Sequence, residues 1–415
     1  MLRIQMTLAL SLAIVGVLLC VEAQCQTKIE SVEQWIKVPA ADRPAFSEQA
    51  FANETISKSR AEKVSQLLWE DHLSVLREQR KKEWEDKVIS IDDHEMKFDF
   101  RVFGDKPETG RRLFISMHGG GGTRASVNTQ QWKNQIGLYE PKEGVYLAPR
   151  APTDAWNMWH KDHIYEFFHR IILDAMLFED VDPNRVYLMG YSAGGDGVYQ
   201  MAPRMADSLA AAAMMAGHPN GASPANLRNI GFALHMGAND RAYKRNEIAG
   251  KWKVRLEKLQ KEDPEGYKHQ AKIHEGLGHW MQKKDAVAVP WMSEFVRDPQ
   301  PEKVVWNKPG APRKNFYWLA IDAAPEKKNK GNLVVTRKGQ DFDIESANEI
   351  VDFRLRLNDS VADLDKEVIV TLDGKSVLTS KPDRKPIHIY QSIKAHSDPH
   401  RIYSAQVAVK LGDRG

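Results

Sequence analysis

A serine between glycines directly follows a short apolar run. Val186 to Met189 lead into Gly190 to Gly195, which reads Gly-Tyr-Ser-Ala-Gly-Gly, and a helix is expected to follow. A serine on a sharp strand-to-helix turn exposes its hydroxyl, and the flanking glycines leave room for the neighbouring backbone. The first N–H groups of the helix, beginning with Ala193, can stabilise negative charge. The pattern predicts that Ser192 is a nucleophile; the alternative is a glycine-rich turn with an idle serine.

A second glycine-rich loop follows another apolar run. Leu113 to Met117 end in His118 and four consecutive glycines, 119–122. Glycine lets the backbone approach a substrate to within hydrogen-bond distance, so Gly120 or Gly121 is expected to donate an N–H to an oxyanion. His118 is expected to hold the shape of this loop. A flexible linker is the alternative, but a linker would join domains instead of continuing a buried strand.

An acid and a base follow the serine in the order that this type of triad requires. Asp240 lies in the loop after the apolar run Phe232 to Met236, and His279 ends a Gly-Leu-Gly-His loop after the next short strand. We expect His279 to take the proton of Ser192, with Asp240 orienting the imidazole. Asp240 could instead cap a turn or a helix.

Other polar and aromatic residues carry weaker expectations. His274, expected within the strand before the loop, competes for the role of base, and Asp285 is another loop acid. His218 is expected to line a pocket. Trp156 and Trp159 follow another strand and could stack on a sugar or aryl group, although packing against the helix that starts near His163 is slightly favoured. No His-Glu-x-x-His or comparable ligand set is present, so neither a metal nor another cofactor is expected.

Alternating elements must position these residues. Short apolar runs at 113–115, 145–147, 186–189 and 232–234 are typical of buried parallel strands. Helical spacing of apolar residues at 164–172 and 248–259 separates them. The order predicts an α/β fold with a doubly wound, mostly parallel sheet, in which chemistry lies at the carboxyl ends of the strands.

Composition excludes some functions. The 415 residues carry a net charge of +3, with basic residues spread along the chain, which argues against nucleic-acid binding.

Residues 1–23 combine Arg3, an apolar run and small residues before a cleavage site, which predicts a signal peptide and a secreted or periplasmic protein. A retained anchor is the alternative. Cleavage would leave Cys25 as the one cysteine, so no internal disulfide is expected.

Two further regions flank the expected catalytic domain at 89–297. Residues 24–88 are expected to form a helical extension, with one amphipathic helix over Ile56 to Lys87. Residues 298–415 contain alternating strand patterns, a hairpin signal at Asp373-Gly374 and no visible helical period. They predict a C-terminal β-sandwich of the immunoglobulin or fibronectin type.

The chain resembles the α/β-hydrolase family over Ile89 to Arg297. The resemblance rests on the glycine loop 118–122, the turn 190–194 and the loops of Asp240 and His279. It is most similar to the secreted bacterial esterases, the branch of polyhydroxybutyrate depolymerases and feruloyl or acetylxylan esterases. It implies an eight-stranded sheet and cofactor-free ester hydrolysis. The lack of disulfides departs from many members, and the acidic residue in Gly195-Asp196-Gly197 is explained here only by the helix dipole.

Together these patterns predict a secreted serine hydrolase that cleaves carboxylic esters through an acyl-enzyme. The expected substrate is a small-molecule or polysaccharide-linked ester, with no nucleic-acid partner and no membrane span after signal cleavage. One alternative is a serine peptidase of the prolyl-oligopeptidase type, although few residues precede the catalytic region for a β-propeller. The other is a non-catalytic binding protein on a hydrolase fold. The oligomeric state stays open.

Overall fold

The computed structural model describes residues 29–310, 313–321 and 331–412. The predicted signal peptide, 1–23, lies outside the described residues. The chain divides into two compact units. Unit 1 contains the residues up to Leu76, Arg356–Glu367 and Ser380–Val407, and unit 2 contains Arg77–Leu355, Val368–Thr379 and the residues from Ala408. The boundaries expected at 88/89 and 297/298 follow sequence texture and stay predictions, since units defined by contacts do not test them.

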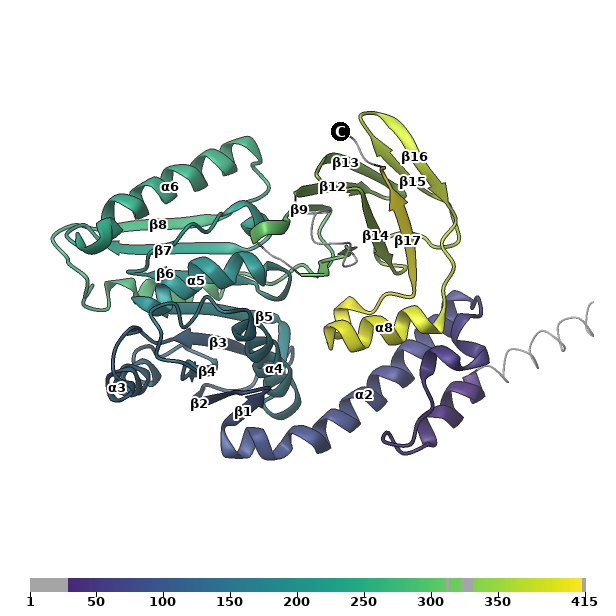
Figure 1. The fold of residues 1–415 in the computed structure, drawn as a ribbon, viewed down its shortest axis with the longest axis horizontal. Coiled ribbons are helices and arrows are strands. Elements are labelled where there is room, and N and C mark those ends of the chain that lie inside the picture. Colours follow the sequence, from purple (N-terminus) through teal and green to yellow (C-terminus); the bar gives the residue numbers. More distant parts are fainter. Residues whose placement is uncertain (1–28, 311–312, 322–330, 413–415) are drawn as a thin grey trace, which may run out of the picture. The chain divides into compact units, whose positions relative to one another are not determined.

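An eight-stranded sheet dominates unit 2 (Figure 1). Its spatial order is β1-β2-β4-β3-β5-β6-β7-β8. The pairs β1–β2 and β2–β4 are antiparallel, and every pair from β4 to β8 is parallel. This confirms the expected doubly wound, mostly parallel sheet. The strands are β1 (Val88–Ile91), β2 (His94–Phe103), β3 (Arg111–Met117), β4 (Gly144–Pro149), β5 (Val181–Tyr191), β6 (Ala211–Met215), β7 (Gly231–Gly237) and β8 (His269–His274).

Helices cover both faces of this sheet. Gln135 of the helix after β3 donates to Ser116 of β3 at 2.7 Å, and the short helix that follows β8 packs on the same face. On the other face, Tyr199, Phe232 and Trp252 bring two further helices against β7. The helices are α3 (Ala125–Ile136) and α7 (Ala288–Met292) on the first face, and α4 (Asp162–Phe178), α5 (Ala193–Arg204) and α6 (Arg245–Glu262) on the second.

Parallel register brings the functional loops to one edge of the sheet. Met117, the last residue of β3, pairs with Gly190 of β5, and Tyr191 pairs with Met215, the last residue of β6. Gly237 of β7 likewise pairs with His274 of β8. The loops that begin after these residues therefore meet at the carboxyl edge, as expected for this fold.

The C-terminal region forms two smaller sheets. One has the order β10-β11-β14-β17 and the other β16-β15-β13-β12-β9. Asp373 and Gly374, with φ of 51° and 72°, turn the chain between β15 and β16, as the hairpin signal predicts. The strands are β9 (Lys303–Asn307), β10 (Asn315–Phe316), β11 (Leu319–Ala320), β12 (Asn332–Lys338), β13 (Asp341–Asn348), β14 (Asp352–Leu357), β15 (Val368–Leu372), β16 (Lys375–Ser380) and β17 (Ala405–Lys410).

Two details of this region differ from expectation. The pair β13–β15 is parallel, unlike the antiparallel sheets of an immunoglobulin or fibronectin type. The expectation of no helix is also wrong, because α8 spans Pro386–His396. Proline at its first turn suits a helix start, and Ile389 and Ile393 lie one turn apart on a buried face. Three isoleucines in a short segment give too weak a period to separate from a strand.

Unit 1 has a hydrophobic core of its own. It combines Trp35 and Phe46 with Leu68 of α2 (Lys58–Asp86) and Ile389 of α8. An ion pair of Arg43 with Asp71 adds two hydrogen bonds of 2.6 and 2.7 Å. The observed bounds of α2 agree closely with the helix expected over 56–87.

The last part of α2 belongs to unit 2 and packs on α4. Arg170 donates to Glu83 at 2.6 Å, and the indole of Trp84 donates to Glu179 at 3.0 Å. Arg80 lies 3.4 Å from Asp174, whose side chain has no exposed surface. Burial raises the pKa of Asp174 to about 8.

The folding stability of the wild type should fall as pH rises, and the substitution Asp174→Asn should remove part of that loss. Between pH 4 and 8 the unfolded chain releases the Asp174 proton while the folded chain retains it, so folding stability falls as pH rises through this window. Relative to wild type, the variant should gain roughly 3 to 4 kcal/mol of unfolding free energy between pH 5 and 8. Urea unfolding at both pH values measures this. Glu85→Gln, at an exposed ion pair on α2, is the control that should show no such gain; an equal gain there contradicts the assignment.

Candidate active site

Ser192 occupies a strained turn between β5 and α5. Its φ of 58° and ψ of −120° are rare for a residue with a side chain. The turn is so tight that a Cβ on Gly190 would lie 2.3 Å from the carbonyl oxygen of Gly194, and a Cβ on Gly194 would lie 2.1 Å from that of Met117. Both positions therefore exclude every residue except glycine. The geometry is that of a nucleophile elbow.

A chain of hydrogen bonds joins the serine, the histidine and the aspartate expected from sequence. His279 Nε2 lies 2.9 Å from Ser192 Oγ, and His279 Nδ1 lies 2.7 Å from Asp240 Oδ2. Asp240 is 3% exposed, whereas the His279 side chain is 44% exposed. The aspartate can hold the imidazole with Nε2 directed at the serine hydroxyl, and Nε2 is then free to accept the serine proton.

Tyr191, next to the serine, positions the histidine loop. Its hydroxyl donates to the carbonyl oxygen of His279 at 2.6 Å and accepts from the N–H of Met281 at 2.9 Å. The tyrosine is 8% exposed, and burial raises its pKa well above the ordinary range. Sequence reasoning missed this role, since the position between glycine and serine in the motif tolerates many residue types.

The competing base and acid lie elsewhere. His274 Nε2 is 3.1 Å from Nδ1 of His235, and burial lowers the pKa of His235 to about 3. Asp285 is fully buried and accepts a hydrogen bond from the hydroxyl of Tyr139. Burial raises the pKa of this carboxyl. Neither His274 nor Asp285 hydrogen-bonds to Ser192 or His279.

Two backbone N–H groups of the glycine loop, those of Gly120 and Gly121, are candidates to bind an oxyanion, and one of them is already hydrogen-bonded to a side chain. The N–H of Gly121 donates to Asn128 Oδ1 at 2.8 Å, so it is already occupied. Gly120 makes no hydrogen bond to any described residue, and its φ of 102° together with an Asn128 oxygen 2.2 Å from a Cβ position requires glycine. Ala193 begins α5 beside Ser192. The N–H of Gly120 is therefore available at the pocket that Gly120 and Ala193 line with Ser192, whereas the N–H of Gly121 is occupied.

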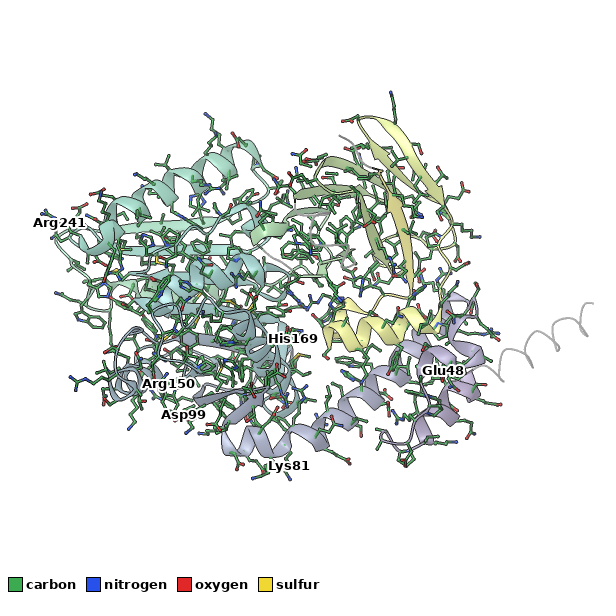
Figure 2. The ribbon with its side chains drawn as sticks, viewed as in Figure 1. Glu48, Lys81, Asp99, Arg150, His169 and Arg241 are labelled. Carbon is green, nitrogen blue, oxygen red and sulfur yellow. The ribbon has the colours of Figure 1, made fainter. Side chains whose placement is uncertain are left out.

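Buried polar groups hold this loop. Asn128 Nδ2 donates to Asp154 at 2.8 Å, and Asp154 also accepts from Arg150, which Figure 2 labels. His118 is fully buried, with Nδ1 2.6 Å from the carbonyl oxygen of Gly119, and Nε2 accepts from the N–H of Ala151 at 3.2 Å. Burial lowers the pKa of His118 to about 4, so the ring is neutral at pH 7. Its contacts agree with the expected role in loop shape.

The two tryptophans have different environments. Trp159 is 1% exposed, donates its indole N–H to the carbonyl oxygen of His118 at 3.0 Å and packs on Gly197. The expectation that Trp159 offers a stacking surface is therefore wrong, because close packing against the backbone of α5 encloses it. Trp156 is 62% exposed and lines the pocket at Ser192.

The pocket at Ser192 has a volume of about 350 Å³. His218 lines it, as expected, and the N–H of His218 donates to Asp196 Oδ1 at 2.6 Å. Asp196 Oδ2 accepts from Asn220 at 3.1 Å. The acidic residue after Gly195 thus holds the loop of His218 in place. The full lining comprises Gly120, Gly121, Trp156, Ser192, Ala193, Asp196, His218, Asn220, Tyr243 and Arg245.

Among known proteins, several solved esterase structures resemble part of this chain, with low sequence identity and low TM-scores. No protein-family model matches the sequence, and no curated protein sequence matches it. Among solved structures, a thermostable esterase is 19% identical with a TM-score of 0.39, over 51% of this chain and 64% of that one, which is less than two thirds of its length. A ferulic acid esterase is 14% identical with a TM-score of 0.36, over 50% and 96%. The Bacillus cereus carboxylesterase is 17% identical with a TM-score of 0.34, over 48% and 94%. At these scores the fold class rests on the strand order and register above.

Two surveys of the described residues complete the site. No helix within 29–310, 313–321 and 331–412 is both long and apolar enough to cross a bilayer. Within the same ranges, no three histidine, cysteine, aspartate or glutamate side chains are grouped to hold a metal ion.

The substitution Gly194→Ala should disrupt the elbow. The added methyl would lie 2.1 Å from the Met117 carbonyl oxygen, so the backbone must shift at a cost of about 3 kcal/mol of unfolding free energy. Thermal unfolding and labelling of Ser192 by a fluorophosphonate measure the effect. Gly250→Ala is the matched control: it lies within α6 with no atom near its Cβ position and should gain up to about 1 kcal/mol. Equal stability of the two variants would contradict the packing argument.

Proposed function

We propose that this protein is a serine hydrolase of the α/β-hydrolase type that cleaves carboxylic esters. The observation that carries the proposal is the unbroken hydrogen-bond chain from Ser192 through His279 to Asp240, beside a backbone N–H at Gly120. A nucleophile, a base, a group that orients the base and an oxyanion site are the parts that acyl transfer requires.

The proposed reaction has two stages. As Ser192 Oγ bonds to the ester carbonyl carbon, His279 Nε2 takes its proton, and the carbonyl oxygen becomes an oxyanion held by the N–H groups of Gly120 and Ala193. The carbon–oxygen bond to the alcohol then breaks, and His279 gives its proton to the leaving oxygen. A water molecule attacks the acyl-enzyme by the same route, which releases the acid and restores Ser192. Asp240 stabilises the imidazolium in both stages.

The substrate and location are part of the proposal. The pocket of about 350 Å³ suits a small acyl or aryl group, and exposed Trp156 offers it a flat apolar face. An ester of modest size, free or attached to a polysaccharide, fits these features. The signal-like residues 1–23 support export to the periplasm or beyond the cell.

Ser192→Ala should abolish esterase activity. The variant should lose about 10⁴-fold or more in kcat for 4-nitrophenyl acetate, because triad members act as a unit. A fluorophosphonate probe should label the wild type at Ser192, with an unchanged melting temperature in the variant and full wild-type activity in EDTA. Esterase activity that survives the substitution would show that Ser192 is not the nucleophile. A folded wild type that neither reacts with the probe nor hydrolyses the ester would leave a non-catalytic binding protein. Faster turnover of peptidyl amides than of esters would favour a peptidase.

Asp240→Asn should leave the fold intact and reduce kcat by about 10⁴-fold, because an asparagine favours the wrong imidazole tautomer. Asp285→Asn is the matched control at a buried carboxyl that bonds to Tyr139. It should keep activity within a few-fold of wild type. Steady-state kinetics on 4-nitrophenyl acetate measures kcat for both variants. Loss of activity in the Asp285 variant alone would show that Asp285, and not Asp240, orients the imidazole of His279.

A further inference from the structure

One cation in the lining of the Ser192 pocket makes no hydrogen bond within the part of the chain that the structure describes. Arg245, the first residue of α6, lines the same pocket as Ser192, and its side chain is only 13% exposed. It makes no hydrogen bond to any described residue, and its buried Nε is unsatisfied. Asp240 Oδ1 is the nearest acidic atom, 3.8 Å from a terminal nitrogen, which is too far for a hydrogen bond. The two atoms still form an ion pair, but a nearly buried guanidinium whose hydrogen-bond donors are unused is costly, so a ligand that accepts its hydrogen bonds is expected.

The chain reaches Arg245 through strained backbone. Tyr243 and Lys244 have φ of 54° and 56°, in the left-handed region that is unfavourable for a residue with a side chain. Tyr243 also lines the pocket, and its ring lies 4.8 Å from the guanidinium carbon of Arg245. A cation over an aromatic face is attracted and oriented without use of its N–H groups. The turn thus places the guanidinium at the pocket wall beside the Tyr243 ring, with its N–H donors unused by any described residue.

Asp196, the acidic residue of the pocket lining, and Asp240 beside the pocket already have hydrogen-bond partners. Both oxygens of Asp196 accept hydrogen bonds, from the N–H of His218 and from the amide of Asn220. Asp240 holds the imidazole of His279 with its other oxygen. Arg245 is therefore the one charged group in the lining without a hydrogen bond to a described residue.

We propose that the ester substrate carries a carboxylate, which Arg245 binds through charge-assisted hydrogen bonds in the Ser192 pocket. The inference rests on the proposed esterase function and narrows its substrate class to acidic esters. The planar guanidinium matches a carboxylate with two parallel N–H donors. The pocket of about 350 Å³ contains both the nucleophile and the cation, so the carboxylate belongs to the small acyl or alcohol part that enters it.

Matched ester pairs test this proposal on the acyl side and on the alcohol side. The acyl pair is 4-nitrophenyl hydrogen glutarate and its methyl ester; the alcohol pair is 4-acetoxybenzoate and its methyl ester. For each pair, the ratio of kcat/KM for the charged and the neutral ester is measured in the wild type, Arg245→Met, Arg245→Lys and Arg241→Met. Arg241 lies on the same loop, is exposed and does not line the pocket; Figure 2 labels it. Its variant removes the same charge from the surface, and melting temperatures check folding throughout.

In at least one pair, Arg245→Met should lower the charged-to-neutral ratio by about 10- to 100-fold, the loss expected for hydrogen bonds to a charged group. Arg245→Lys should keep part of the preference, and Arg241→Met should keep it within about threefold. Equal losses for charged and neutral esters in Arg245→Met would instead make Arg245 a positioning residue for Asp240 and overturn the proposal. Hydrolysis of both pairs without a change in ratio would overturn it as well, while the esterase function stands. If no ester is hydrolysed and no probe labels Ser192, the esterase function fails with it.

Discussion

The close approach of three backbone segments around Ser192 is the constraint on which the site depends. The N–H of Ser192 donates to the carbonyl oxygen of Met215 at 2.9 Å, and Gly194 leaves no room for a Cβ beside Met117. The ends of β3, β5 and β6 therefore meet at one turn. Because the glycine loop begins directly after β3, the nucleophile and the oxyanion donors share one rigid frame. The strained dihedrals of Ser192 persist because this frame determines them.

The base is held by a different kind of structure. His279 lies on a loop after β8 and is secured by side-chain hydrogen bonds from Tyr191 and to Asp240. Each such bond contributes on the order of 1 kcal/mol, far less than the packed ends of three strands. The histidine loop is also packed against backbone, because a Cβ on Gly237 would lie 2.0 Å from the carbonyl oxygen of Gly278, and the N–H of Asn239 donates to the carbonyl oxygen of Leu277 at 2.8 Å.

Local patterns were enough to find much of the fold and the residues brought together at the site. Buried strands such as 186–189 and the glycines around Ser192 carry constraints that act over a few residues, so they are visible in sequence. The strand Ala211–Met215 was not, because a run of alanines is equally typical of a helix. The burial of Trp159 and the roles of Tyr191, Asn128 and Arg245 depend on partners distant in the chain. A tryptophan on a loop gives no sign of whether its ring faces solvent or the core.

The contact between Asn128 and the glycine loop also constrains how this sequence can change over evolutionary time. The amide oxygen of Asn128 occupies the space that any side chain at position 120 would need, and the same oxygen accepts the N–H of Gly121. A larger residue at 120 is blocked while the asparagine is present. Loss of the asparagine first would free the N–H of Gly121 for another partner. A change at position 120 therefore requires a change at position 128 first, and even then the φ of 102° at Gly120 opposes a side chain. The intermediate sequence would carry a free N–H at Gly121 in the glycine loop.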